Sequence, residues 1–158
     1  MICTRMRQFF LATVLCLFMP ALAAQPLPVV ASFSILADMV REVGGPHVEV
    51  TSLVGPNTDA HVFDPTPADA KRIASARLVF VNGLGFEGWL DRLVKASGYR
   101  GPIVIASKGV KTPLQLKDTH PHTGATKGHG AHHAHGVADP HAWQNLANAE
   151  RYVETIRI

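Results

Sequence analysis

The chain has 158 residues, nine histidines and a formal net charge of +3. This length is enough for one domain of ordinary size. Without Arg5 and Arg7 near the start, 13 basic side chains (15 − 2) stand against 12 acidic ones, which excludes the broad basic surface of a nucleic-acid-binding protein.

Residues 1–24 are predicted to be a cleaved export signal. The two arginines precede an uncharged apolar stretch at residues 9–19, and residues 21–23 are Ala-Leu-Ala, which suits a signal peptidase. We expect cleavage just before Ala24 or Gln25. Residues 25–158 would then form a periplasmic protein.

Both cysteines, Cys3 and Cys16, lie inside this predicted signal. The mature chain would therefore have no disulfide and no thiolate, and any metal would be bound by nitrogen and oxygen. A lipoprotein is less favoured, because Leu15 stands where a lipidated cysteine is normally preceded by a small residue. A retained membrane anchor is also less favoured, since a spanning helix needs about twenty apolar residues.

Strand and helix patterns alternate along the rest of the chain. Strands are predicted at residues 27–32, 47–54, 78–81 and 102–106. Helices are predicted at residues 35–43, 66–76 and 87–96, the second with Thr66 as N-cap and Pro67 in the first turn. This alternation predicts an α/β fold, with a parallel sheet flanked by helices.

A last helix is predicted after Asn145 as N-cap and runs toward Ile158. No glycine or proline closes it, so we interpret the chain as a fragment. Between the fourth strand and this helix, residues 118–137 have too little apolar content to pack and are predicted to be a flexible loop.

Two histidines lie in polar segments between predicted elements. His61 follows the second strand, and parallel sheets bind ligands beyond the carboxyl ends of their strands. His141 follows Asp139 and Pro140, and the aspartate suits a partner for the imidazole ring. Imidazole is the commonest metal ligand in proteins. The alternatives are a solvated loop histidine at 61 and a histidine that packs beside Trp143 at 141.

The predicted loop at residues 118–137 is rich in histidine. Closely spaced imidazoles gather borderline metals such as zinc, whereas manganese prefers oxygen ligands. The loop is therefore predicted to be an accessory zinc-binding tract. The alternatives are a disordered spacer, or incidental copper and nickel binding. Its histidines are His120, His122, His129, His132, His133 and His135.

Two motifs resemble a known family, the cluster A-I solute-binding proteins of bacterial ABC importers for zinc and manganese. They are Asp-Ala-His-Val-Phe-Asp-Pro-Thr-Pro at residues 59–67 and Asp-Pro-His-Ala-Trp at residues 139–143. The resemblance implies a receptor of two α/β lobes joined by a long helix. Its amino-terminal lobe supplies two histidines that match His61 and His141. A third histidine or a glutamate, and a late aspartate, come from a carboxyl-terminal lobe, which we expect to be missing here.

The resemblance and the histidines together predict a monomeric, non-enzymatic zinc receptor that delivers its ion to an ABC permease in the inner membrane. A manganese or iron receptor of the same family is one alternative. A periplasmic zinc store or chaperone that works through the histidine-rich tract is another. A metalloenzyme is disfavoured, because no His-Glu-x-x-His pattern supplies a general base near two ligands.

Overall fold

The computed structural model describes residues 24–110 and 139–157. Nearly all of the predicted signal segment and the whole predicted histidine-rich loop lie outside the described residues. So do the six histidines of that loop and both cysteines.

Four parallel strands form the sheet, in the order β2-β1-β3-β4. They are β1 (Leu27–Phe33), β2 (Val48–Val54), β3 (Leu78–Val81) and β4 (Ile103–Ile105). β1 is central, and its Val29 pairs with Val50 on one side and Leu78 on the other. The prediction of an α/β fold with a parallel sheet is confirmed, with strand bounds within a residue or two of those expected.

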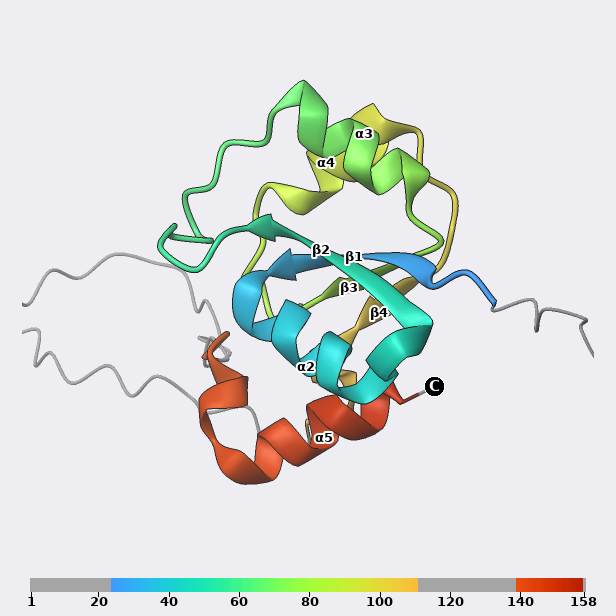
Figure 1. Cartoon of the computed structure of the whole chain (residues 1–158). Helices are drawn as coiled ribbons and strands as arrows, with labels where there is room; N and C mark the ends of the chain where they lie inside the picture. The colour runs from blue at the N-terminus through green and yellow to red at the C-terminus, as the bar shows by residue number, and fades with distance from the viewer. Residues whose placement is uncertain (1–23, 111–138, 158) are drawn as a thin grey trace, which may run out of the picture.

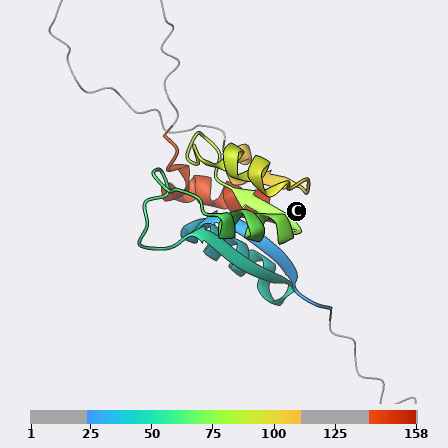
Figure 2. The same ribbon diagram turned by 90° about the horizontal axis from the view of Figure 1, so that it is seen from above.

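Helices cover both faces of the sheet (Figure 1). α3 (Pro67–Ser75) and α4 (Leu90–Ser97) lie on one face, which Figure 2 views from above. α2 (Ser34–Gly44) and α5 (Leu146–Ile156) lie on the other. Three short 3₁₀ turns complete the described elements: η1 (Gly45–His47), η2 (Ala106–Gly109) and η3 (Ala142–Gln144).

The buried strands explain why this sheet forms. The last five residues of β1 and the last three of β3 are buried, because helices pack on both sides of these two strands. β2 alternates more strongly between exposed and covered side chains, as expected at a sheet edge. The core therefore runs along β1 and β3, and the carboxyl ends of these strands face the two histidine loops.

Helix α3 begins as its sequence predicts. The Thr66 hydroxyl accepts a hydrogen bond from the backbone N–H of Asp69, and the Asp69 carboxylate accepts one from the backbone N–H of Thr66. Burial alone would raise the pKa of Asp69, but hydrogen bonds from Thr66 and Arg72 and the charge of Arg72 hold it below its usual value. This cap fixes where the loop that carries His61 ends.

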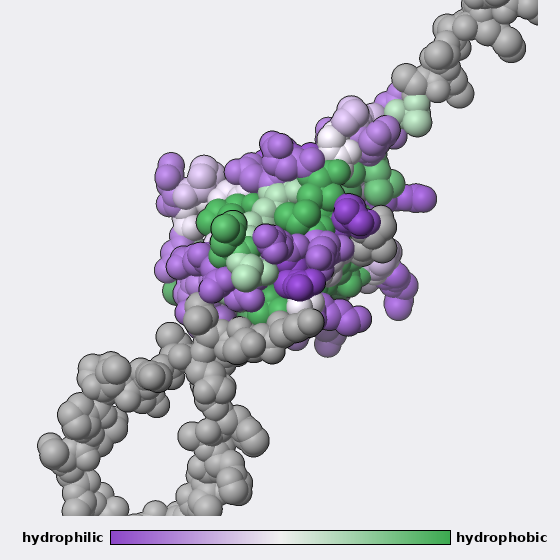
Figure 3. All heavy atoms as spheres, turned by 90° about the horizontal axis from the view of Figure 1, so that it is seen from below, coloured by the Kyte–Doolittle hydropathy of each residue, from purple (hydrophilic) through white to green (hydrophobic). Residues whose placement is uncertain are grey.

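The surface around α5 keeps several apolar side chains in contact with solvent (Figure 3). Leu146 of α5 is 79% exposed, and Ile35 of α2 and Val153 of α5 are also exposed. Within residues 24–110 and 139–157, no helix has the length and apolar character needed to cross a bilayer.

Candidate metal centre

His61 lies in the loop between β2 and α3, beyond the carboxyl end of the sheet, as predicted. Its backbone N–H donates to the carboxylate of Asp59, 2.8 Å away, which forms a tight local turn. The carbonyl of Ala60 accepts a hydrogen bond of 2.8 Å from the indole N–H of Trp89, which is 3% exposed. Both polar groups of the peptide bond before His61 are thus held.

His141 lies just before η3 and repeats this arrangement. Its backbone N–H donates to the carboxylate of Asp139 at 2.9 Å. The carbonyl of Pro140 accepts a hydrogen bond of 2.8 Å from the side-chain amide of Asn82. Unlike His61, His141 also bonds to its aspartate through the ring, with Nδ1 2.8 Å from Asp139 Oδ1.

The ring contact with Asp139 determines the tautomer of His141. A carboxylate only accepts hydrogen bonds, so the proton must be on Nδ1 of His141. Hydrogen bonds from the backbone and then from the ring of His141 lower the pKa of Asp139, which keeps it ionised near neutral pH. Nε2 of neutral His141 therefore has a free lone pair.

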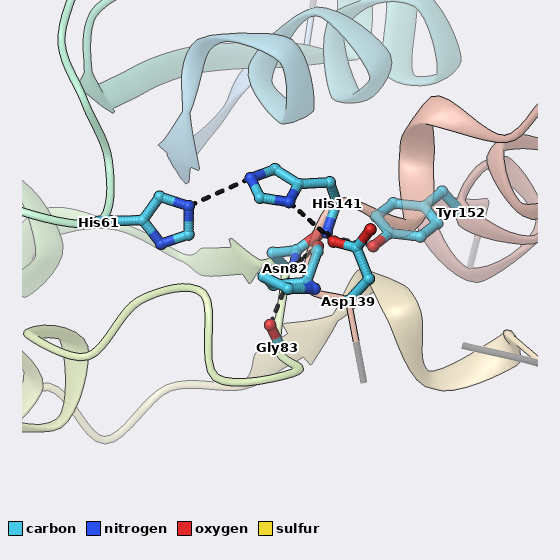
Figure 4. Close-up of polar contacts among 7 residues, drawn as sticks. His61, Asn82, Gly83, Asp139, His141 and Tyr152 are labelled. Atoms are coloured by element: carbon cyan, nitrogen blue, oxygen red, sulfur yellow. Dashed lines mark hydrogen bonds and ion pairs between the residues drawn. The ribbon is translucent and has the colours of Figure 1, made fainter. Parts of the chain in front are cut away.

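The two imidazoles face each other across the edge of the sheet (Figure 4). Nε2 of His61 lies 3.2 Å from Nε2 of His141, although the residues are 80 positions apart in sequence. The lone pair of His141 points into this gap. Without a metal, the pair can share one proton as a hydrogen bond; with a cation, both nitrogens are within reach of one ion.

Aromatic side chains form a floor beneath the two rings. Phe86 contacts both, with ring centroids 4.6 Å from His61 and 5.8 Å from His141, each in an edge-on arrangement. Phe33 and Trp143 pack against Phe86 at 4.9 and 5.0 Å. Trp143 also lies 5.4 Å from His141. This floor restricts the rings on the side away from solvent.

Residues 82–89 form the support between the two loops. Asn82 and Trp89, at the ends of this segment, hold the two histidine loops, and Phe86 lies under both rings. Glu87 closes the turn: its carboxylate accepts hydrogen bonds from the backbone N–H groups of Asn82 and Gly83 and from the hydroxyl of Ser32.

The structure corrects the sequence-based interpretation of this segment. The predicted helix at residues 87–96 includes Glu87, but Glu87 is only 9% exposed and lies in the turn, and α4 begins three residues later at Leu90. Gly83 makes the turn possible, because its φ is +83° and a Cβ there would lie 2.5 Å from Ile105. Unpaired N–H groups in such a turn require an acceptor, and this was the available signal for a buried carboxylate.

Within residues 24–110 and 139–157, no group of three or more His, Cys, Asp or Glu side chains is placed to hold one ion. The described part of the chain therefore offers two nitrogen donors at this edge. The six predicted accessory histidines, from His120 to His135, lie outside it.

Residues 29–158 match the model of a protein family described as the zinc-uptake complex component A, periplasmic. The chain belongs to this family. The family is described by metal uptake, and the relatives reported next are named for metal binding. Both agree with the expectation of a non-enzymatic protein.

Relatives of this chain carry names for different metals. The chain is 33% identical over 131 residues to the manganese-binding lipoprotein MntA of Halalkalibacterium halodurans, covering 83% of this chain and 38% of the relative. It is 30% identical over 138 residues to the iron-binding protein YfeA of Yersinia pestis, covering 87% and 40%.

A solved structure of a relative supports the fold. The manganese-bound periplasmic metal-binding protein of Candidatus Liberibacter asiaticus has a TM-score of 0.64 and 30% sequence identity, over 83% of this chain and 43% of that one. The chain thus spans about 40% of the length of the relatives it matches.

Proposed function

We propose that this chain is the metal-capturing part of a periplasmic receptor that delivers its ion to an ABC permease. His61 and His141 each donate Nε2 to the ion, which is the cargo of the receptor. The separation of 3.2 Å between the two Nε2 atoms supports this proposal most strongly. Family membership supports the transport role, since the family description names a periplasmic uptake complex.

The distance suits a shared zinc ion. With Zn–N bonds of about 2.0–2.1 Å, nitrogens 3.2 Å apart make an angle of about 100° at the ion, near the tetrahedral value. The Asp139 carboxylate orients the His141 ring and holds its proton on Nδ1, which leaves Nε2 to bind the ion. The remaining coordination positions would be filled by groups outside the described residues or by water.

Zinc is our proposed cargo because the two described donors are imidazole nitrogens and because the loop at residues 118–137 is rich in the same ligand. Manganese or iron is the second candidate, favoured by the names of the relatives MntA and YfeA. Affinity alone does not separate these candidates, since most sites with nitrogen ligands bind zinc more tightly than manganese. Uptake of radioactive zinc, manganese and iron by cells with and without the gene does separate them, because only the physiological cargo should lose its high-affinity uptake.

The ligand assignment is tested by replacing each histidine with alanine in the purified protein and titrating Zn²⁺ against a chelator. His47→Ala is the matched control, because His47 is exposed in η1, just before β2 begins, whereas His61 follows the end of that strand. His61→Ala and His141→Ala should each weaken binding by more than the roughly 10- to 100-fold loss typical of outer partners. Wild-type affinity in either variant would contradict the assignment.

The histidine-rich tract requires its own experiment. We propose that it gathers zinc near the site but is not needed for the tight site. Deleting residues 120–135 should therefore remove weak binding equivalents and leave one tight site. Loss of nearly all high-affinity binding on deletion would instead favour a zinc store that works through the tract.

A further inference from the structure

The peptide bond before His141 is held at both of its polar groups, by Asp139 and by Asn82. The Asn82 side chain can do this only in one orientation. Asp139 accepts from the N–H, and the Asn82 side chain donates to the carbonyl of Pro140. A primary amide holds a carbonyl only when its NH₂ end faces that carbonyl. The position of His141 therefore depends on which way the Asn82 amide is turned.

Tyr152 of α5 holds the other end of this amide. Its hydroxyl donates a hydrogen bond of 2.6 Å to Oδ1 of Asn82, while Nδ2 of Asn82 donates to the carbonyls of Pro140 and Gly83 (Figure 4). Turning the amide over would bring Oδ1 against two carbonyl oxygens, which repel it. The hydroxyl stabilises the amide in the orientation that holds the His141 segment.

The hydrogen bond between Tyr152 and Asn82 is shielded from water, and the Tyr152 hydroxyl stays protonated. Tyr152 and Asn82 are both 0% exposed, so no water is available to replace the hydroxyl. Burial and the negative charge of Glu87 raise the pKa of Tyr152 to about 12, so the hydroxyl remains a donor across the physiological range.

We infer that Tyr152 is a positioning residue for the metal site: through Asn82 it sets the Pro140 carbonyl and thereby the placement of His141 opposite His61. The inference rests on the proposed function, in which these two histidines bind the ion. The inference connects the metal site to α5, which lies on the face of the sheet opposite to α4. The His61 side has no equivalent, because the indole of Trp89 reaches the Ala60 carbonyl directly.

The test compares Tyr152→Phe with Tyr99→Phe. Tyr99 is a matched control, because its hydroxyl also donates to a chain carbonyl, that of Pro102, at the end of β4 away from the site. Tyr152→Phe should weaken Zn²⁺ binding about 10-fold, at the lower end of the range for outer partners, and Tyr99→Phe should leave it unchanged. Asn82→Ala, which removes the donor itself, should weaken binding more than Tyr152→Phe does.

A second readout separates positioning from loss of stability. In the metal-free protein, ¹H–¹⁵N spectra should show the backbone N–H signal of His141, which bonds to Asp139, shifted by Tyr152→Phe and that of His61, which bonds to Asp59, unchanged. An unaltered His141 N–H signal with wild-type affinity would overturn the inference, as would equal shifts of both N–H signals, which indicate general loosening. Wild-type zinc binding by His61→Ala and His141→Ala would instead overturn the proposed function, and the backbone signals would still report how the His141 segment is held.

Discussion

The loop that carries His61 and the segment that carries His141 follow the same plan but are held in different ways. In each, an aspartate two positions earlier accepts the backbone N–H of the histidine, and a buried side chain donates to the carbonyl of the intervening residue. Each is also followed by a capped helix, α3 or α5. On the His141 side, the aspartate additionally binds the ring.

The two sides differ in whether the hydrogen bonds fix only the backbone or the imidazole ring as well. On the His61 side the hydrogen bonds fix the backbone, and the ring is restrained by its edge-on contact with Phe86. On the His141 side the backbone, the ring orientation and the tautomer are all fixed. A ring with a fixed tautomer presents its lone pair before the ion arrives, whereas a ring that can still turn adjusts to the ion. We therefore expect His141 to be the preorganised ligand and His61 the adaptable one.

Among the groups that hold the two histidines in place, Asp139 should have the largest effect on metal binding, and Asp59 is its counterpart. Asp139→Ala removes the acceptor of both the backbone and the ring of His141 and should weaken Zn²⁺ binding by about 10- to 100-fold. Asp59→Ala removes only a backbone acceptor and should cost less than about 10-fold. Chelator competition on both variants measures the difference. Equal losses would show that orientation of the His141 ring does not contribute to affinity.

A smaller effect is expected from Trp89→Phe. This substitution keeps an aromatic ring against Phe63 but leaves the Ala60 carbonyl without its donor. Because Ala60 is buried, the free energy of unfolding should fall by about 1–3 kcal/mol, measured by urea unfolding.

Backbone ¹H–¹⁵N spectra of the same variant sharpen the comparison of the two sides. Trp89→Phe should shift the N–H signal of His61 and not that of His141, which mirrors the expectation for Tyr152→Phe. If Trp89→Phe moved the His141 N–H signal instead, the two sides would not be held independently.

Much of the fold follows from local patterns. The apolar runs of β1 and β3 and the cap of α3 at Thr66 each carry a signal that a few neighbouring residues determine. The two histidines were also predicted as candidate ligands from sequence, through the short motifs around them. Their separation was not, because the 3.2 Å gap arises only when the fold places the His141 segment beside Asn82, just after β3.

The supporting residues were the hardest to predict. Glu87 lies in an apparently helical pattern, and only the glycine-containing turn before it directs its carboxylate inward. Tyr152 fits the apolar spacing of α5, and nothing near it in sequence identifies Asn82 as the partner of its hydroxyl. Contacts of this kind depend on the tertiary fold, which local sequence patterns do not encode.

The smallest expected effect concerns the N-terminal caps of α3 and α5, the helices that follow the two loops. α3 is capped with the help of a carboxylate, Asp69, whereas α5 is capped by the uncharged side chain of Asn145. Asp69→Asn and Asn145→Ala should each lower the free energy of unfolding by about 1 kcal/mol at pH 7. The pKa of Asp69 is lowered on folding, so its stabilisation is present above the unfolded value of 3.8 and is lost as pH falls below that value.

Urea unfolding followed by circular dichroism between pH 7 and pH 3 therefore separates the two caps. The destabilisation caused by Asp69→Asn should shrink on acidification, because the wild-type carboxylate becomes protonated and loses its advantage over the amide. That caused by Asn145→Ala should stay constant, because neither the amide nor the backbone N–H groups of Ala147 and Asn148 titrate. An equal decline for both variants would mean that acid weakens the whole domain. The charge of Asp69 in the cap that ends the His61 loop would then make no separate contribution to the free energy of unfolding.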